Sequence, residues 1–311
     1  MYKYVLKRLI MIIPVIIGVS LIIFVAMDLA PGSAVDVLKT DDMSEEEIAV
    51  LEHQLGLDQP LLVRYAKYMA GLVQGDLGVS YISHQDVVKT YFEKLPATGA
   101  LAIAALIVAI LISIPLGITS AVHHGSIRDN VAMIFALLGL SMPNFWVGLL
   151  LIIYLSNGLG WFPSGGFDGL KSIVLPAITL GTGFTATITR TTRSSMLDVL
   201  NADYLRTARA KGVDESVVVN KHGLKNALIP IITVAGTNLG AMLGGSVLTE
   251  TVFAWPGVGR LIIDSVNSRD TPMVTGSIIM TTILISIVLL VVDLLYAFVD
   301  PRLKSRYAKG H

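Results

Sequence analysis

The chain has 311 residues, of which 53% are hydrophobic and 15% charged, and its mean hydropathy is +0.71. So low a charged fraction is typical of a membrane protein and excludes an ordinary soluble domain. Acidic residues and Lys plus Arg number 23 each, so net charge indicates no partner, and the absence of cysteine excludes disulfides and thiolate chemistry. No nucleic-acid partner is expected, because the basic residues are spread over the ends of apolar segments.

The first predicted element is a membrane helix at Leu9–Met27. This stretch holds 19 residues without a charge and follows a basic N-terminus. It is long enough to span a bilayer, and no small-residue cleavage site follows it. We therefore interpret it as an uncleaved helix rather than a signal peptide, with its N-terminus on the inner side of the membrane.

A polar segment follows at Asp28–Ala97. It contains twelve acidic and five basic residues, a balance that favours the outer side of the membrane. We expect three helices in it. The first is capped by Ser44 and stops at Gly56, the second starts at Pro60, and the third is capped by Ser83. A self-packed cap without a ligand of its own is the favoured interpretation, and a specific binding site is the alternative.

Five further spans are predicted in the rest of the chain, at Thr98–Val122, Val131–Leu155, Ile173–Ile188, Leu228–Val252 and Thr275–Val299. The segment from Ile173 is short, rich in Thr and Gly and broken by Pro176, so we expect it to be buried among other helices. Gly236, Gly240 and Gly244 have the spacing that permits close helix contact, although glycine is also common in membrane helices generally.

Lysine and arginine are unevenly divided between the two sides that these spans define. Segments assigned to the inner side hold fifteen, and the outer segments hold eight over a longer total length. Basic residues are enriched in cytoplasmic loops. We therefore predict an all-α polytopic membrane protein with six transmembrane helices and both chain ends in the cytoplasm.

The most basic inner segment is Arg190–Pro230, with seven lysines and arginines. Side chains that recur every three or four residues predict an amphipathic helix in it: Leu197, Leu200, Tyr204, Ala208 and Lys211. Gly212 is expected to follow as a left-handed cap. Asp214 can then cap a second helix, which we expect to stop or bend before Pro230. Such an element could receive a mechanical push from a partner.

The chain lacks the common catalytic and cofactor-binding motifs. No Gly-x-x-x-x-Gly-Lys-Ser/Thr occurs, so the chain has no P-loop for a nucleotide. His-Glu-x-x-His and Gly-x-Ser-x-Gly are also absent, and the six histidines fall in loops or at helix ends. We therefore expect no catalytic residue, cofactor or metal in this chain. Asp293 is the ionisable residue that we single out inside a span, and we expect it to pair near Asp300 and Arg302 at the inner interface.

The basic inner segment resembles the cytoplasmic "EAA" loop of ABC importer permeases, whose consensus places Glu-Ala-Ala before a glycine. Ala208 and Gly212 match this consensus. Arg206 and Thr207 depart from it, and the proline that usually follows arrives late, at Pro230. For this stretch alone, a basic loop that merely obeys the positive-inside rule is the alternative.

Motifs along the chain are similar to one branch of that family, the first permease subunit of dipeptide, oligopeptide and nickel importers. In chain order they are Leu55–Pro60, Gly75–Ser80, Ser141–Trp146, His222–Pro230, Val252–Leu261 and Asp293–Arg302. Each motif alone is moderately specific, but their order over nearly the whole chain is strongly specific. On these motifs the chain is identified as a member of that branch.

The resemblance implies a type I importer permease fold in two parts. Residues 1–97 would form the first helix and the extracytoplasmic segment, and residues 98–311 a five-helix core with a coupling loop at 190–230. It also implies the partners: a second permease subunit, two cytoplasmic ATPase subunits that hold ATP and magnesium, and an extracytoplasmic solute-binding protein. The expected place is the inner membrane of a bacterial or archaeal cell. Coupling to the ATPases would fall to Tyr204, Arg206, Thr207, Ala208, Lys211 and Gly212.

The cargo implied by the resemblance is a short peptide. Small polar side chains on two spans are the candidate path lining: Thr179, Thr182, Thr185, Thr237, Asn238 and Ser246. No histidine lies within a span, which favours a peptide over nickel, the alternative in the same family. An ion-coupled secondary transporter is a second alternative, although it would need an ionisable site at the membrane midplane.

Overall fold

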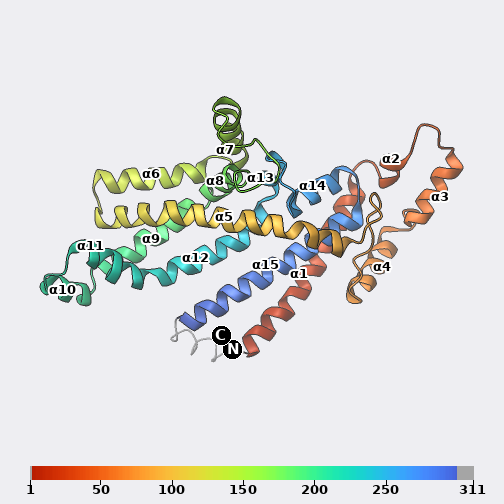
Figure 1. Ribbon diagram of the computed structural model, residues 1–311. Coiled ribbons are helices and arrows are strands. Elements are labelled where there is room, and N and C mark those ends of the chain that lie inside the picture. Colours follow the sequence, from red (N-terminus) through yellow and green to blue (C-terminus); the bar gives the residue numbers. More distant parts are fainter. Residues whose placement is uncertain (1, 300–311) are drawn as a thin grey trace.

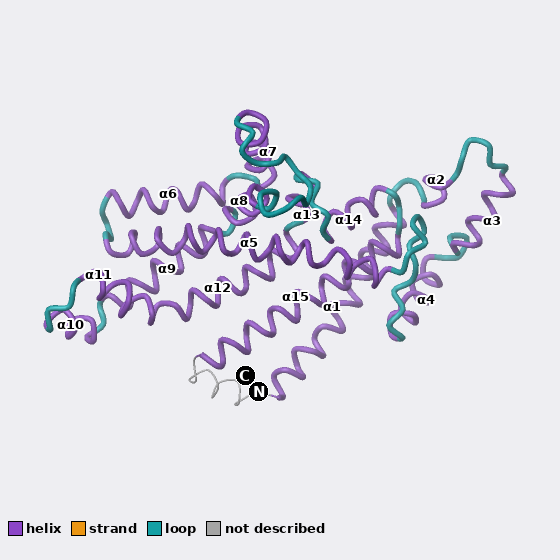
Figure 2. The backbone as a smooth tube through the Cα atoms, in the orientation of Figure 1, coloured by secondary structure: helices purple, strands orange, loops and turns teal. Residues whose placement is uncertain are grey.

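A computed structural model of the chain describes residues 2–299 (Figure 1). Within that range the elements are helices joined by turns and loops, and the only β-type pairing is a bridge between Val79 and Asp86 (Figure 2). The predicted all-α fold is confirmed. Asp300 and Arg302, which we expected to pair with Asp293, lie outside the described residues.

The N-terminal part forms five helices, α1 (Tyr2–Leu29), α2 (Ala34–Leu38), α3 (Glu45–Leu55), α4 (Leu61–Val73) and α5 (Val87–Val122). The predicted capping box at the start of α3 is present. The Ser44 hydroxyl accepts a hydrogen bond from the Glu47 amide, and the Glu47 carboxylate accepts one from the Ser44 amide. Gly56 ends α3 with a φ of 67°, and α4 follows Pro60, both as predicted.

The third helix predicted for the outer segment is wrong in its start and its extent. Asp86 and not Ser83 caps α5, because the Asp86 carboxylate accepts a hydrogen bond from the amide of Lys89. Ser83 lies in a turn, where its amide donates to the Ser80 hydroxyl. α5 then runs through residue 97 without a break, so the boundary that we placed there falls inside a helix. The division into two parts stays a prediction.

The span predicted at Val131–Leu155 is a bent pair of helices. α6 (Ile127–Ser141) is followed by α7 (Asn144–Leu151), which continues as the π-helical segment η1 (Ile152–Gly158). The two arms meet at 97°. The bend arises because Met142 precedes a proline and takes an extended conformation that cannot continue the helix. Figure 1 shows α7 standing away from the layer formed by α5 and α6.

The short span predicted at Ile173–Ile188 is divided between α8 (Val174–Thr182) and α9 (Thr185–Leu200). The break therefore lies at Gly183 and the residue after it, and the break that we placed at Pro176 is wrong. Pro176 lies in the first turn of α8, where a missing amide removes no helical hydrogen bond. α9 also continues past the predicted end into the basic inner segment.

The remaining elements are α10 (Asp203–Ala210), α11 (Glu215–Val217), the π-helical segment η2 (Val218–Gly223), α12 (Leu224–Gly245), α13 (Val247–Val252), α14 (Val258–Asn267) and α15 (Thr271–Val299). α11, η2 and α12 form one rod of 31 residues. Pro230 lies inside this rod, so of the two outcomes that we expected, a stop before Pro230 is wrong and a bend stays a prediction. A proline removes one helical hydrogen bond, and a membrane helix packed among others tolerates that loss.

Four helices among the described residues are long and apolar enough to cross a membrane, namely α1, α5, the rod that contains α12, and α15. The bent pair of α6 with α7 and η1 makes a fifth if it crosses once. The sixth predicted span is the one divided between α8 and α9, which have 9 and 16 residues. Each is too short to cross alone, because a membrane helix needs about 20 residues.

The helices pack around a core lined by α5, α8, α9 and α12, to which Leu101, Leu180 and Ile188 contribute. α12 lies against α15 through its glycines. A Cβ at Gly236 would lie only 2.7 Å from both methyl groups of Val292, so only glycine allows this approach. The close helix contact predicted from the glycine spacing is confirmed.

The bundle has two distinct ends. α10 and α11 lie at one end, beside the turn that joins α5 to α6, and α2, α3 and α4 lie at the other (Figure 1). α1 leads toward the end that holds α2 to α4, and α15 runs alongside α1 (Figure 1). The segments that we assigned to opposite sides of the membrane therefore lie at opposite ends of the bundle.

Candidate functional site

α10 is attached to its neighbours through Leu205 and Arg209. Leu205 is its buried residue, with no exposed surface. Beside Gly223 of η2, the Leu205 Cδ1 atom and the Met196 Cε atom of α9 lie 3.8 and 3.5 Å from where a Cβ would stand. Leu205 thus packs α10 against η2, and Arg209 of α10 donates to the Leu200 carbonyl of α9 at 3.4 Å, so a displacement of α10 acts on both.

The six residues predicted for coupling lie on α10 and the turn after it. Five are exposed and Ala208 is half-buried: Tyr204, Arg206, Thr207, Lys211 and Gly212 form the exposed group. The one ion pair of Arg206 among the described residues is a long one, 3.7 Å to Asp203. The face of α10 opposite Leu205 therefore points to solvent, where a partner protein can reach it.

The turn after α10 has the predicted conformation and one further contact. Gly212 is left-handed, with a φ of 78°, and Asp214 caps α11 by accepting a hydrogen bond from the Ser216 amide at 2.8 Å. The hydroxyl and amide of Ser216 lower the pKa of Asp214. Arg209 closes the turn through an ion pair with Glu215 at 2.9 Å, whose hydrogen bonds raise the pKa of Arg209. The sequence did not reveal this pair, because its members lie on different helices.

The single amphipathic helix predicted between Leu197 and Lys211 is wrong. It is two helices, since α9 ends at Leu200 and Ala202 is extended, with φ −73° and ψ 145°. The break rotates α10 relative to the periodic pattern. As a result Leu205 is buried, whereas Tyr204, which the pattern placed on the apolar face, is 45% exposed.

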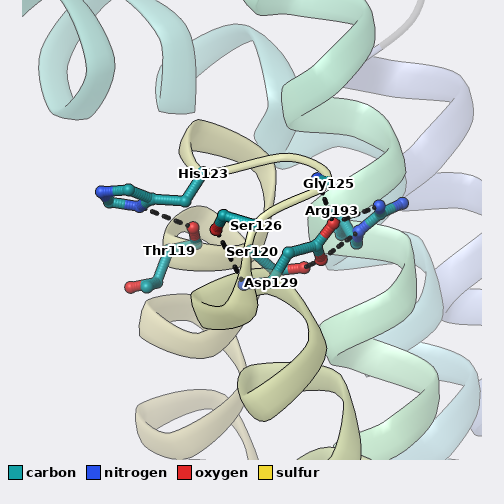
Figure 3. Close-up of polar contacts among 7 residues, drawn as sticks. All are labelled: Thr119, Ser120, His123, Gly125, Ser126, Asp129 and Arg193. Carbon is teal, nitrogen blue, oxygen red and sulfur yellow. Dashed lines mark hydrogen bonds and ion pairs between the residues drawn. The ribbon is translucent and has the colours of Figure 1, made fainter.

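α9 is also tied to the neighbouring turn by an ion pair (Figure 3). Arg193 of α9 donates from Nε and from one terminal nitrogen to the two carboxylate oxygens of Asp129, at 2.9 and 2.7 Å. Asp129 lies in the first turn of α6 and is 4% exposed. It also accepts a hydrogen bond from the Ser120 hydroxyl and one from the Gly125 amide at 3.0 Å. These contacts join α5, α6 and α9, and neither charged residue was among the predicted site residues.

Three of the predicted path-lining residues are buried within this chain. Thr179 and Thr185 have almost no exposed surface, and the Thr185 hydroxyl donates to the Thr182 carbonyl at 2.8 Å. Ser246 is equally buried, and its hydroxyl donates to the Glu250 carboxylate at 2.9 Å. The hydroxyls of Thr185 and Ser246 are thus committed to contacts inside the chain.

The other three predicted path residues are more accessible. Thr237 is exposed, while Thr182 and Asn238 are half-buried. The Asn238 amide donates to the Thr187 hydroxyl at 3.1 Å, which brings α12 and α9 together at this point. The structure therefore does not gather the six predicted residues on one surface of the chain.

Asp293 pairs with the first helix. Its carboxylate accepts hydrogen bonds from a terminal nitrogen of Arg8 and from the Tyr4 hydroxyl, both at 2.7 Å. The expected partners on its own C-terminal side lie outside the described residues. The contact with Arg8 links α15 to α1 near the start of α1, and the predicted pairing of Asp293 near Asp300 and Arg302 at the inner interface stays a prediction.

Glu250 was not predicted to be an ionisable residue of interest, as Asp293 was, although it lies at the end of the predicted span Leu228–Val252. It is fully buried on α13. Its contacts reach Thr98 of α5 and Arg260 of α14. Its position inside a predicted apolar span, a few residues before Trp255-Pro256-Gly257, was the signal that could have indicated it.

The chain matches two family models. Residues 1–102 match the N-terminal model of binding-protein-dependent transport system membrane components, and residues 113–305 match the binding-protein-dependent transport system inner membrane component. The chain belongs to this family of ABC importer permeases. Family membership decides against the ion-coupled carrier considered above.

Named relatives place the permease in the predicted branch. It is 41% identical to the oligopeptide transport system permease protein AppB of Bacillus subtilis and to the dipeptide transport system permease protein DppB of Alkalihalophilus pseudofirmus. It is also 41% identical to the glutathione transport system permease protein GsiC of Salmonella typhimurium. Each comparison covers 98% of this chain and 100% of the relative. The resemblance to peptide importer permeases is confirmed.

A solved structure supports the fold of the permease. An inward-facing MetNI methionine ABC transporter matches 68% of this chain and 97% of the other chain, with a TM-score of 0.58 and 19% identity. At that identity the likeness shows the fold alone, and it confirms the predicted type I importer permease fold. The permease is therefore a multi-pass membrane protein.

Proposed function

We propose that the permease moves short peptides into the cell as one of two membrane subunits of an ATP-driven importer. The proposed cargo is supported by the relatives of this chain, which are named for transport of oligopeptides, dipeptides and glutathione. They are 41% identical to it over 98% of its length. These cargoes differ in length and side chains but share amide groups. A path for all of them is expected to bind weakly through small polar groups instead of fixed charges.

The proposed partners follow from the family. A second permease subunit completes the path, and two ATPase subunits hold ATP and magnesium and contact the exposed face of α10. A solute-binding protein delivers the peptide at the end that holds α2 to α4. The family description, binding-protein-dependent transport, supports this last partner.

The proposed mechanism uses the packing of α10. ATP binding closes the ATPase pair and displaces α10, Leu205 passes the displacement to η2, and the hydrogen bond from Arg209 to the Leu200 carbonyl passes it to α9. α9 leads to α8, and η2 leads to α12, so both helices that carry accessible path candidates move. We propose that Thr182, Thr237 and Asn238 line the path, and that the buried Thr179, Thr185 and Ser246 shape it from behind.

The proposed orientation puts α10 and both chain ends in the cytoplasm of a bacterial or archaeal cell. It is supported by the fifteen basic residues of the inner segments against eight outside. The location of α10 and of the cap α2–α4 at opposite ends of the bundle agrees with this orientation (Figure 1).

Uptake of labelled di- to pentapeptides, glutathione and nickel by cells that lack this subunit tests the proposal, with the complemented strain as the control. We expect peptide uptake to be lost in the deletion strain and restored by complementation. In vesicles, uptake should require ATP and should persist when an ionophore collapses ion gradients. Loss of nickel uptake alone would overturn the peptide cargo while leaving the ATP-driven importer intact.

A further inference from the structure

Three helices of the permease are joined at two levels. At the first level, the Ser113 hydroxyl of α5 donates to the Thr185 carbonyl of α9 at 3.0 Å, and the Thr185 hydroxyl lies 3.4 Å from the Ala136 carbonyl of α6, to which it donates. At the second level, Arg193 of α9 forms its two hydrogen bonds with Asp129 of α6 (Figure 3). Eight residues of helix separate Thr185 from Arg193, a rise of about 12 Å.

Close backbone packing connects the two levels. A Cβ at Gly117 of α5 would lie 2.5 Å from the Thr192 Cβ and 2.9 Å from the Thr189 carbonyl oxygen of α9. α5 and α9 therefore touch at van der Waals distance along the interval between the two junctions. Two attachment points with close packing between them resist both sliding and rotation of one helix against another.

Both oxygens of the Asp129 carboxylate accept hydrogen bonds. One oxygen receives the Arg193 Nε and the Ser120 hydroxyl, and the other receives a terminal nitrogen of Arg193 and the Gly125 amide. Arg193 supplies both its donors from one planar group, so the pair fixes an orientation as well as a distance. A buried charge of this kind is retained only when its partner stays in place.

The connection from α10 to α12 passes through η2 and is less regular than the connection to α9. η2 is a π-helical segment between α11 and α12, and such segments mark places where a helix departs from regular hydrogen bonding. α10 therefore connects to a firmly attached helix on one side and to an irregular helical segment on the other.

We propose that Arg193 and Asp129 are positioning residues that make α5, α6 and α9 a single lever, so that a displacement of α10 moves the turn between α5 and α6 together with α9. This inference rests on the proposed function, because it concerns how the push from the ATPases is distributed. The two residues touch neither nucleotide nor peptide; they act by keeping α9 in register with α5 and α6.

The first test is a distance measurement on the assembled importer in nanodiscs. The chain contains no cysteine, so exposed positions His124, in the turn after α5, and Ser194, on α9, can each be replaced by a spin-labelled cysteine. We expect the distance distribution between the labels to be the same without nucleotide and with ATP trapped by vanadate. A shift on trapping in the otherwise unchanged chain would overturn the single lever.

The second test removes the ion pair of Arg193 with Asp129 and measures peptide transport relative to ATP hydrolysis. Asp129→Asn with Arg193→Gln removes both charges and leaves no unpaired buried charge, and Arg193→Lys keeps the charge without the planar pair of donors. Arg128→Gln is the matched control, because Arg128 is exposed and adjacent to Asp129 in the same turn. All variants are compared by peptides transported per ATP hydrolysed and by the spin-label distances.

We expect the neutral pair to keep hydrolysing ATP while the number of peptides per ATP falls by at least about fivefold, the lower end of coupling between sites. The label distances should then change with nucleotide, Arg193→Lys should be intermediate, and Arg128→Gln should match the unchanged chain. An unaltered transport ratio in the neutral pair would refute the positioning role. If the unchanged complex shows no ATP-driven peptide uptake, the proposed function fails, whereas the label distances still decide the lever.

Discussion

The hydroxyl of Thr98 donates a hydrogen bond at 2.8 Å to the carboxylate of Glu250, which lies 152 residues further along the chain. The Ser246 hydroxyl and the Arg260 amide donate to the same carboxylate at 2.9 and 3.1 Å. Glu250 has no exposed surface, and among the described residues its partners are these donors instead of a cation. The carboxylate thereby fixes α13 and the start of α14 against the N-terminal half of α5.

Glu250→Ala should lower the thermal stability of the permease strongly. The substitution leaves buried donors of Thr98 and Ser246 without their acceptor, and each such donor costs about 1–3 kcal/mol. Glu250→Gln keeps one acceptor oxygen and should be intermediate. The temperature at which half the detergent-solubilised protein stays monodisperse measures the effect, with the exposed Glu46→Ala as the control. Equal temperatures for the two alanine variants would show that the carboxylate is dispensable.

Gly236→Ala should weaken the contact between α12 and α15, whereas Gly245→Ala should not. A methyl group at Gly236 would stand 2.7 Å from two atoms of Val292, but at Gly245 nothing lies within 4 Å. Overpacking of this kind typically costs about 1–3 kcal/mol. Both glycines lie in α12, where alanine forms helix more readily than glycine, so a loss of stability at Gly236 cannot come from helical propensity. The same melting temperature for both variants would contradict the packing argument.

Local features of the fold could be predicted from the sequence, because their signals lie within a few residues. The capping box of Ser44, the left-handed Gly212 and the cap at Asp214 belong to this class. Features that depend on another helix could not. The burial of Leu205 depends on Gly223 of η2, which approaches it only in the folded chain.

Breaks inside apolar segments were missed for a related reason. The segments on either side of Met142 are both apolar and were predicted as one span, although Pro143 carried the signal for the 97° bend. Pro230 shows the opposite error, since a strong helix-breaking signal was outweighed by the packing of α12 in the bundle. The charged pairs could not be predicted because their members lie far apart in the sequence. Arg193 lies 64 residues from Asp129, with no periodic relation between them.

Glu46 should be accessible from outside the cell and Asn220 from inside. Both are exposed, and they lie on α3 and η2, at opposite ends of the bundle. Ser44 is less suitable as a probe because it caps α3, and Ser216 donates to Asp214. Single-cysteine variants at positions 46 and 220 are treated with an impermeant maleimide before and after permeabilisation. Labelling of position 220 in intact cells would reverse the proposed orientation.

Gly212→Glu should leave the permease inserted and assembled while uncoupling ATP hydrolysis from uptake. Gly212 has a φ of 78°, and nothing lies within 4 Å of a Cβ placed there, so a side chain meets no clash. The left-handed conformation costs a residue with a Cβ about 1–2 kcal/mol. The carboxylate adds negative charge beside the exposed face of α10, where the ATPases are proposed to bind.

Two further variants at position 212 separate the strain from the charge. Asparagine tolerates the left-handed conformation, so Gly212→Asn should retain most uptake, and Gly212→Ala should show the effect of strain alone. Uptake and ATP hydrolysis by the purified complex are measured for all three, with assembly checked by size-exclusion chromatography. We expect peptides moved per ATP to fall in the order Asn, Ala, Glu. Full uptake in Gly212→Glu would remove this turn from the coupling route and leave Leu205 and the rest of α10 to carry it.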